Sequence, residues 1–136
     1  MPRIHRMEAV PRAVRQRHVL IVEDNLELAA TYRELLEVHG YDVSLSPNGA
    51  EALKHVMIHP TDAVVCDLQM PRLEGDLFYA TIERAQPALA RRFVFITGLA
   101  EDARFQDFIT HVQTPVLRKP VQVTALLAEV ARAMTR

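Results

Sequence analysis

The segment "DAVVCDLQMPRLEG", Asp62–Gly75, drives an apolar run directly into a carboxylate and then into a turn. Its central run, residues 63–66, does not alternate apolar and polar side chains, which is typical of a strand covered on both faces of a sheet. Asp67 follows this run at once, and Met70-Pro71 then turns the chain. We interpret Asp67 as a nucleophile held at the end of a buried strand; the simpler alternative is a residue that only starts the turn.

Strand-length apolar runs alternate with helical patterns through the rest of the chain. Strands are expected at residues 18–23, 41–45, 62–67, 92–97 and 115–118, and helices at 25–40, 46–59 (after an initial turn), 75–85, 101–112 and 121–134. Five strands alternating with five helices are typical of βαβ units. Right-handed crossovers place helices on both faces of such a sheet. We therefore predict an α/β fold, a doubly wound three-layer sandwich around a five-stranded parallel sheet.

Size and composition describe one ordinary globular domain. The 136 residues are 49% apolar and 24% charged, with a net charge of −1, and no apolar run approaches the roughly 20 residues of a membrane span. The single cysteine, Cys66, excludes an internal disulfide and fits a reducing, cytoplasmic location. It falls within an expected strand and is interpreted as an inert, small apolar residue.

The N-terminal segment differs from the rest in charge. Residues 1–17 carry five arginines and one glutamate, a net +4, which leaves −5 for residues 18–136. The segment lacks the apolar region of a secretory signal, and its few apolar residues and two prolines predict a flexible basic leader or linker. Its charge is also suited to nucleic acid or to an acidic partner. The folded domain is expected at residues 18–136.

Polar groups follow the expected strands at one edge of the sheet. In open α/β sheets ligands bind outside the carboxyl ends of the strands, where the strand order reverses. The strands are followed, in chain order, by Glu23-Asp24, Ser46-Pro47-Asn48, Asp67, Thr97-Gly98 and Lys119-Pro120. Three carboxylates, one hydroxyl and one ammonium are therefore expected to share this edge.

This set of motifs resembles a response-regulator receiver domain of two-component signalling. The matching elements are the acidic pair at Glu23, the block "DLQMPRLEG" at Asp67, "TG" at Thr97 and "KP" at Lys119, and the resemblance covers about residues 18–135. It implies a flavodoxin-like sheet with strand order 2-1-3-4-5, and a cis peptide bond between Lys119 and Pro120. Each motif alone is weak, but four in order, each at its own strand end, are specific.

The resemblance also implies a magnesium site. In the implied order strands 1 and 3 are neighbours about 4.8 Å apart, which crowds Glu23, Asp24 and Asp67. Three carboxylates that close resist joint ionisation unless a cation joins them, and oxygen ligands with open water positions suit Mg²⁺. Asp24 and Asp67 would bind the ion through their side chains, Glu23 directly or through water, and Gln69 through its backbone carbonyl.

The implied activity is phosphoacceptance. A sensor histidine kinase or a phosphotransfer protein would donate a phosphoryl group from phosphohistidine to Asp67. Lys119 would pair with the phosphoryl oxygens, and Thr97 would hydrogen-bond to them. The domain would promote only its own aspartyl phosphorylation and dephosphorylation, so the chain is not expected to be an enzyme in any other respect.

Two features bear on how such a domain would signal. Receivers usually carry Tyr or Phe three residues before the lysine, but this chain has Val116, whose single stiff torsion cannot make the usual switching swing. Leu99 would shield the acyl phosphate from water, whereas Gln69 would orient that water, so both a long and a short phosphoryl lifetime stay open. A phosphorylation-independent interaction module with the receiver fold is the alternative function.

The expected partners are proteins. Phosphorylation is expected to alter a surface that binds an unknown downstream protein, and a homodimer through the fourth helix, fifth strand and fifth helix is one option. Without a recognisable DNA-binding module or apolar span, neither nucleic-acid nor membrane binding is expected. The chain is either a stand-alone regulator or a receiver cut from a larger protein.

Other interpretations exist for individual residues. Asp24 and Glu27 match an N-terminal capping box. His55 and His59 stand at i, i+4, but Val56 occupies the place of the glutamate in the zinc-protease motif, so a surface pair is preferred. A haloacid-dehalogenase phosphatase needs a second Asp two residues after the first, where this chain has Gln. The sequence also lacks a Walker loop and the Ser/Thr-rich phosphate loop of flavodoxins.

Overall fold

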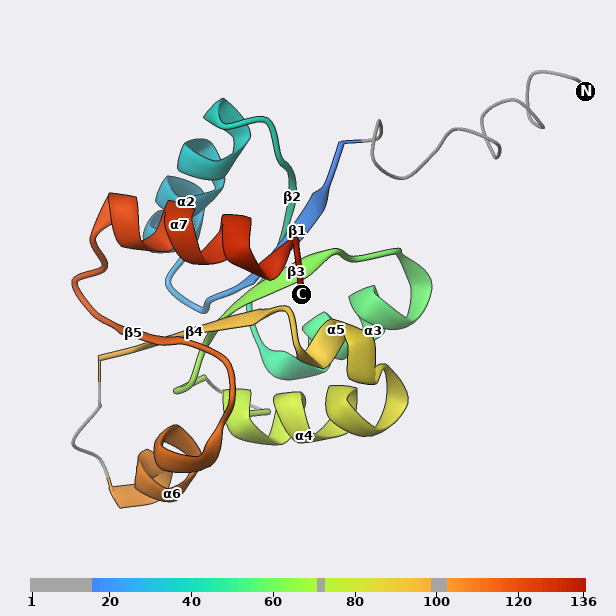
Figure 1. Ribbon diagram of the computed structural model, residues 1–136, viewed down its shortest axis with the longest axis vertical. Coiled ribbons are helices and arrows are strands. Elements are labelled where there is room, and N and C mark those ends of the chain that lie inside the picture. Colours follow the sequence, from blue (N-terminus) through green and yellow to red (C-terminus); the bar gives the residue numbers. More distant parts are fainter. Residues whose placement is uncertain (1–15, 71–72, 99–102) are drawn as a thin grey trace, which may run out of the picture.

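A five-stranded parallel sheet organises the molecule (Figure 1). The computed structural model describes residues 16–70, 73–98 and 103–136. The strands are β1 (His18–Val22), β2 (Asp42–Ser46), β3 (Ala63–Asp67), β4 (Phe93–Thr97) and β5 (Val116–Arg118). Their spatial order is β2-β1-β3-β4-β5, and each neighbouring pair is parallel. The predicted doubly wound fold and its strand order are confirmed.

Six helices are described in these ranges. They are α2 (Leu26–Val38), α3 (Gly49–Ile58), α4 (Gly75–Ala85), α5 (Pro87–Ala90), α6 (Ala103–His111) and α7 (Val123–Ala133). Helices α2 and α7 cover one face of the sheet, and α3, α4 and α5 lie on the other (Figure 1). Among the residues that the structure describes, no helix combines the length and apolar character needed to cross a membrane.

The prediction of five helices misses α5. The sequence pattern indicates that Pro87 closes the preceding helix, and α4 does end at Ala85. Pro87 also begins α5, because proline at a first helical position removes an N–H that would have no partner there. Leu89 and Ala90 of this short helix are buried, so it closes the core rather than leaving a solvent-exposed link.

Side chains of the central strands alternate between the two faces of the sheet. From β1, Leu20 and Val22 enter one core cluster, whereas Val19 and Ile21 enter the other. All four are buried. Since both faces are covered by helices, both sets of side chains must be apolar, which accounts for the unbroken apolar runs.

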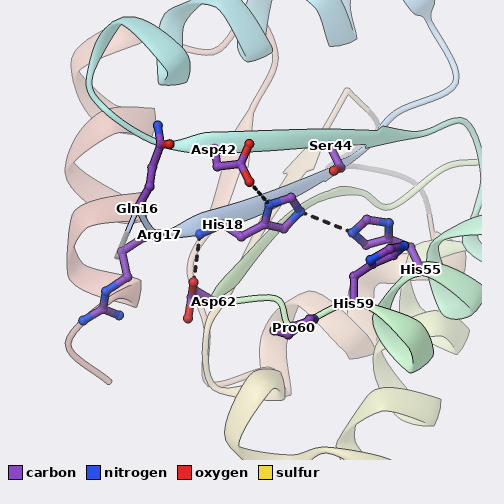
Figure 2. A pocket seen from close by; sticks show the side chains of 9 residues that line it. All are labelled: Gln16, Arg17, His18, Asp42, Ser44, His55, His59, Pro60 and Asp62. Carbon is purple, nitrogen blue, oxygen red and sulfur yellow. Dashed lines mark hydrogen bonds and ion pairs between the residues drawn. The ribbon is translucent and has the colours of Figure 1, made fainter. Parts of the chain in front are cut away.

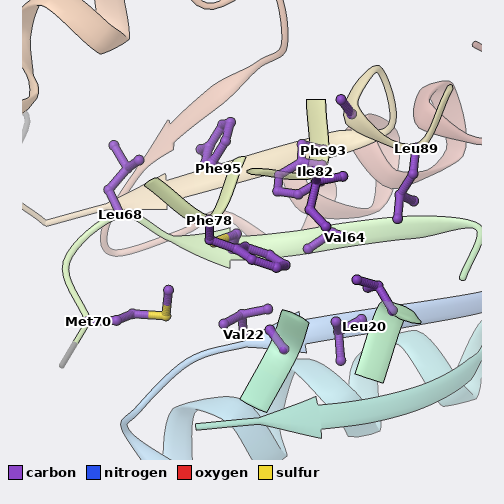
Figure 3. Packing of buried hydrophobic residues seen from close by; sticks show 14 of the residues in the cluster. Leu20, Val22, Val64, Leu68, Met70, Phe78, Ile82, Leu89, Phe93 and Phe95 are labelled. Carbon is purple, nitrogen blue, oxygen red and sulfur yellow. The ribbon is translucent and has the colours of Figure 1, made fainter. Parts of the chain in front are cut away.

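Aromatic rings lie close together within the apolar cluster on the α4 side of the sheet (Figure 3). The ring of Phe78 in α4 lies 5.6 Å from that of Phe93 in β4, centroid to centroid, and Phe93 lies 5.3 Å from Phe95. The three side chains are fully buried, and burial of each contributes about 1.5–3 kcal/mol. Cys66 of β3 belongs to the same cluster, so this packing holds the strand that ends in Asp67.

The start of α2 corrects one interpretation of the acidic pair. Asn25, not Asp24, is the N-cap: its Oδ1 accepts a hydrogen bond from the Leu28 N–H at 3.1 Å. Asparagine is among the preferred capping residues, because its short side chain reaches the unpaired N–H groups of the first turn. The capping box of Asp24 and Glu27 is therefore wrong, and the Asp24 carboxylate does not serve as the cap of this helix.

Candidate functional site

The carboxyl ends of four strands hold the polar residues that the sequence singles out. Glu23 follows β1, Asp67 ends β3, Thr97 ends β4 and Lys119 follows β5. Val22, the last residue of β1, pairs with Cys66 of β3. Glu23 and Asp67 are the next residues of the two chains, so they lie opposite each other. The β1–β3 neighbour relation therefore places two carboxylates side by side.

Three carboxylates converge at this edge. Glu23, Asp24 and Asp67 each offer an oxygen, and these oxygens all lie within 4.8 Å of one another. Glu23 and Asp67 are only 3% and 5% exposed, whereas Asp24 lies in the open. Buried carboxylates need charge partners or hydrogen-bond donors to stay ionised, so the partners of these two groups decide their state.

Lys119 bridges the two buried carboxylates. Its Nζ lies 2.9 Å from Asp67 Oδ2 and 3.1 Å from Glu23 Oε1. The remaining oxygens accept backbone hydrogen bonds: Asp67 Oδ1 from the Gln69 N–H at 3.1 Å, and Glu23 Oε2 from the Asn25 N–H at 3.2 Å. Asp67 is thus held by hydrogen bonds at both oxygens, which fixes its orientation. Glu23 is held by one backbone hydrogen bond, while its buried Oε1 has the ion pair with Lys119 but no hydrogen-bond partner among the described residues.

Burial and mutual repulsion change the ionisation of this group. Burial, and after it the negative charge of Asp67, raises the pKa of Glu23 to about 7. Burial acts to lower the pKa of Lys119, but its hydrogen bond to Asp67 and the charges of both carboxylates outweigh burial, so that pKa is raised. Lys119 is therefore a cation at neutral pH, while Glu23 is divided between its two protonation states.

The oxygen set fits a small, hard divalent cation. Ligands on opposite sides of Mg²⁺ lie about 4.1 Å apart, because Mg–O distances are 2.0–2.1 Å, so oxygens within 4.8 Å of one another need only small shifts to share an ion. One ammonium against three carboxylates leaves an excess of negative charge that such a cation would neutralise. The open pocket around these groups, about 550 Å³, has room for bound water.

The backbone of Asp67 and Leu68 lies against the start of α4. A Cβ atom on Gly75 would lie 2.5 Å from the Asp67 carbonyl oxygen and 2.9 Å from Leu68 Cα, closer than packed atoms approach. The Gly75 N–H donates to the Leu68 carbonyl at 2.9 Å. The close approach of these two backbones requires glycine here, and it fixes the segment that carries the carboxylate.

Other predicted residues take less direct positions. Thr97 is buried at the end of β4, and its carbonyl accepts a hydrogen bond from the Lys119 N–H at 2.9 Å. Gln69 lines the acidic pocket and is exposed. The Lys119-Pro120 peptide bond is cis, as the family resemblance suggests. Leu99 lies outside the described residues, as does most of the basic leader.

Two positions that the sequence flags lie in the core. Val116 of β5 pairs with Phe95 of β4 and packs, partly buried, against the aromatic cluster. Cys66 is fully buried, and burial raises the pKa of its thiol well above the ordinary value. A protonated, inaccessible thiol is unreactive, which agrees with the interpretation of Cys66 as a small apolar residue.

Three residues of the acidic pocket escape the sequence reasoning: Asn25, Met70 and Glu74. Asn25 directly follows the acidic pair, at the expected start of a helix. Backbone N–H groups at a helix start have no partner within the helix, so the position of Asn25 already indicated a hydrogen-bond donor beside Glu23. Glu74 precedes α4, and its Oε1 lies 3.3 Å from Arg104 Nη1 of α6. Nothing in the local pattern points to that ion pair, which joins segments 30 residues apart.

Known proteins are similar to this chain in sequence. The chain matches the family described as response regulator receiver domain over residues 19–131. The tetrathionate response regulatory protein TtrR of Salmonella typhimurium is 29% identical over 115 residues, 85% of this chain and 55% of that protein. The sensor kinase CckA of Brucella abortus is 28% identical over 120 residues, 87% of this chain and 12% of that protein. The chain spans about half or less of the length of the relatives it matches.

Solved structures share the fold. A CheY-like response regulator receiver domain protein from Methanospirillum hungatei superposes with a TM-score of 0.81. The superposition covers 89% of this chain and 95% of that one, at 20% sequence identity. At this identity the likeness bears on the fold alone, and it agrees with the sheet order described above.

Proposed function

The chain belongs to the response-regulator receiver family of two-component signalling, and on this premise we propose that Asp67 is its phosphoacceptor. A sensor histidine kinase or a phosphotransfer protein supplies the group as phosphohistidine. A carboxylate oxygen of Asp67 attacks the phosphorus, a P–O bond forms, and the P–N bond breaks. The imidazole leaves with the bonding electron pair and takes up a proton, and Asp67 becomes an acyl phosphate.

The observation that carries this proposal is the placement of the Asp67 carboxylate. Asp67 is 5% exposed and ends a central strand. Its carboxylate accepts hydrogen bonds from the Lys119 ammonium and the Gln69 N–H. Burying a carboxylate beside two others offers no gain in stability over apolar side chains of similar size. A carboxylate fixed in one orientation is, in contrast, what attack on a positioned phosphorus requires.

The surrounding residues divide the remaining tasks. Glu23, Asp24, Asp67 and the Gln69 carbonyl would hold Mg²⁺, which when bound neutralises charge shared between the carboxylate and the phosphoryl oxygens. Lys119, cationic because its pKa is raised, turns from the two carboxylates to a phosphoryl oxygen. The Thr97 hydroxyl, at the end of the neighbouring strand β4, donates to another. No proton needs to leave the protein in this step, since its nucleophile is already a carboxylate.

The output surface is the less conventional part of the domain. Val116 stands on β5 between the aromatic cluster and the outer surface, where receivers usually carry an aromatic switch. Phosphorylation must therefore reach the α6–β5–α7 surface by another movement, and there it changes contacts with a downstream protein or a second copy. The same substitution favours the alternative, an interaction module that uses this fold without phosphorylation.

Intact mass spectrometry tests the phosphoacceptor assignment. The protein is incubated with acetyl phosphate and Mg²⁺, and a phosphate adduct is expected on the wild type but not on Asp67→Asn. Asp76→Asn is the matched control: Asp76 lies in the first turn of α4, where its Oδ1 accepts from the Leu77 N–H, and the adduct should persist. An adduct that survives Asp67→Asn would contradict the site, and no adduct in any sample would favour the interaction module.

A further inference from the structure

A second cluster of chemistry-bearing side chains lies at the opposite edge of the sheet (Figure 2). His18 begins β1, Asp42 begins β2, and His55 and His59 stand at the end of α3. Together they line a pocket of about 420 Å³. The phosphoacceptor chemistry proposed for the other edge makes no use of these residues.

His18 is held in one tautomer by Asp42. Its Nδ1 lies 3.0 Å from Asp42 Oδ2, and because an ionised carboxylate only accepts hydrogen bonds, Nδ1 must carry the proton. In the neutral ring, Nε2 then presents its lone pair. A histidine whose far nitrogen donates to a carboxylate is the usual arrangement behind a metal-ligating imidazole.

That lone pair points at a second imidazole. His18 Nε2 lies 3.3 Å from His55 Nε2, and Figure 2 shows the two rings aimed at each other. Two nitrogens bound to one tetrahedral Zn²⁺ at 2.0–2.1 Å lie about 3.3 Å apart. The distance between the two nitrogens therefore already matches that between two ligands of one zinc ion. Each ring must tilt by about 35° from the line that joins the nitrogens, so that both lone pairs meet at the metal.

His59 lies beside this pair and is the third imidazole of the cluster. Its ring lies 4.7 Å from that of His55, centroid to centroid, and the residue is exposed, so its side chain can turn toward the pair. Residues i and i+4 share one face of a helix, which is why these two rings stand together. His18 joins them from a different element, 37 positions earlier in the chain than His55.

We propose that His18, His55 and His59 bind a divalent transition-metal ion, with Zn²⁺ as the best match, and that Asp42 orients His18 for this role. Imidazole ligands favour zinc, copper or nickel over Mg²⁺, so this ion differs from that of the acidic site. With three protein ligands, the fourth position is open to water. The ion would join the start of β1 to the end of α3.

The protonation of His55 agrees with this role. Burial, then the neighbouring His18 and His59, lowers the pKa of His55 below its usual value. The ring is therefore neutral at physiological pH, and metal ligation requires the neutral form. The carboxylates of Asp42 and Asp62 line the same pocket and offset the charge of a bound cation.

Zinc titration of the untagged chain tests the proposal. Zn²⁺ is added in saturating Mg²⁺, against a chelating indicator, and one ion per chain is expected. His55→Gln should weaken this binding by at least about tenfold because it removes a ligand, and Asp42→Asn by about 10- to 100-fold through the lost orientation of His18. His111→Gln, at an exposed histidine on α6, is the matched control and should bind as the wild type does.

A second readout separates metal ligation from a change in folding. Co²⁺ in place of Zn²⁺ should give the visible absorption of a tetrahedral, nitrogen-ligated ion, and His55→Gln should lose it while keeping the wild-type circular dichroism spectrum. The proposal is overturned by absent zinc binding, by equal affinity in the wild type, His55→Gln and Asp42→Asn, or by an equal loss in His111→Gln. Those results would leave the cluster as a hydrogen-bonded pair of rings.

Discussion

Magnesium binding at the acidic site should be linked to the proton of Glu23. With a pKa of about 7, Glu23 is ionised in roughly 90% of molecules at pH 8 and in roughly 10% at pH 6. Because the ion requires the carboxylate, the apparent affinity for Mg²⁺ should fall about tenfold from pH 8 to pH 6. Glu23→Gln should bind Mg²⁺ more weakly throughout but lose most of that dependence, since its amide carries no competing proton.

Calorimetric titration at several pH values measures this linkage. Near pH 7, titrations in two buffers of different ionisation enthalpy should report release of about half a proton per Mg²⁺ bound. Glu74→Gln is the matched control, because Glu74 lines the same pocket but pairs with Arg104, and it should keep the wild-type slope. A wild-type affinity that is flat between pH 6 and pH 8, or a slope that survives Glu23→Gln, would refute the reasoning.

The same ionisation has a consequence for the stability of the metal-free protein. The pKa of Glu23 rises from 4.5, the value of an exposed glutamate, to about 7 in the folded protein, so between these values the folded state binds more protons than the unfolded state. Stability from this group is therefore fully present below pH 4.5 and is lost as the pH rises through 7, by about 3 kcal/mol in total. Urea denaturation of the wild type and of Glu23→Gln across this range isolates the effect.

The remaining predictions concern packing and charge. Gly75→Ala should lower the free energy of unfolding by about 1–3 kcal/mol, because its Cβ would overlap the backbone of Asp67 and Leu68. Gly98→Ala, whose Cβ would meet its nearest neighbour at 3.6 Å, should be tolerated. Equal urea midpoints for the two variants would contradict this prediction. Phe78→Ala should cost about 3–5 kcal/mol by leaving a cavity in the aromatic cluster, and a loss below about 1 kcal/mol in the same assay would show that the cluster collapses around it. Lys119→Met should slow phosphorylation by acetyl phosphate yet bind Mg²⁺ more tightly, because it removes a cation that now lies 3.1 Å from Glu23; weaker Mg²⁺ binding would count against that account.

The sequence was a good guide wherever a strand end carries the information. Apolar runs without alternation located β1 and β3, and the residues that directly follow these runs, Glu23 and Asp67, are carboxylates that meet at the edge. The strand order itself came from the family resemblance, because alternating strands and helices are compatible with several orders. Once β1 and β3 are neighbours, the proximity of Glu23 to Asp67 follows from register.

The sequence was a poor guide where a contact depends on rotamers or on distant segments. The cap of α2 is Asn25 rather than the preceding aspartate. Where several polar residues stand in a row, the sequence does not show which of them caps the helix, and the start of the helix is uncertain by one residue. The short helix α5 has only one turn, so its four residues are too few to show the spacing of apolar residues that indicates a helix. The histidines of α3 were seen as a pair, but His18, which completes the cluster, belongs to a strand 37 positions earlier than His55.

A single strand carries both groups of ligands. His18 begins β1, and Glu23 directly follows its end, so the two backbone positions are five residues, or about 16 Å, apart along an extended strand. That separation is about twice the screening length at physiological ionic strength, a length that applies to the charges of the two pockets that face solvent. A cation in the histidine cluster should therefore change the Mg²⁺ affinity of the acidic site little through charge.

A buried, close-packed β1 transmits displacement only if the strand moves as a unit, and its parallel pairing with β2 on one side and β3 on the other opposes that movement. The two sites are therefore separable in experiments: failure of zinc binding would leave the phosphoacceptor proposal intact, and failure of phosphorylation would leave the histidine cluster to be judged by its own titration.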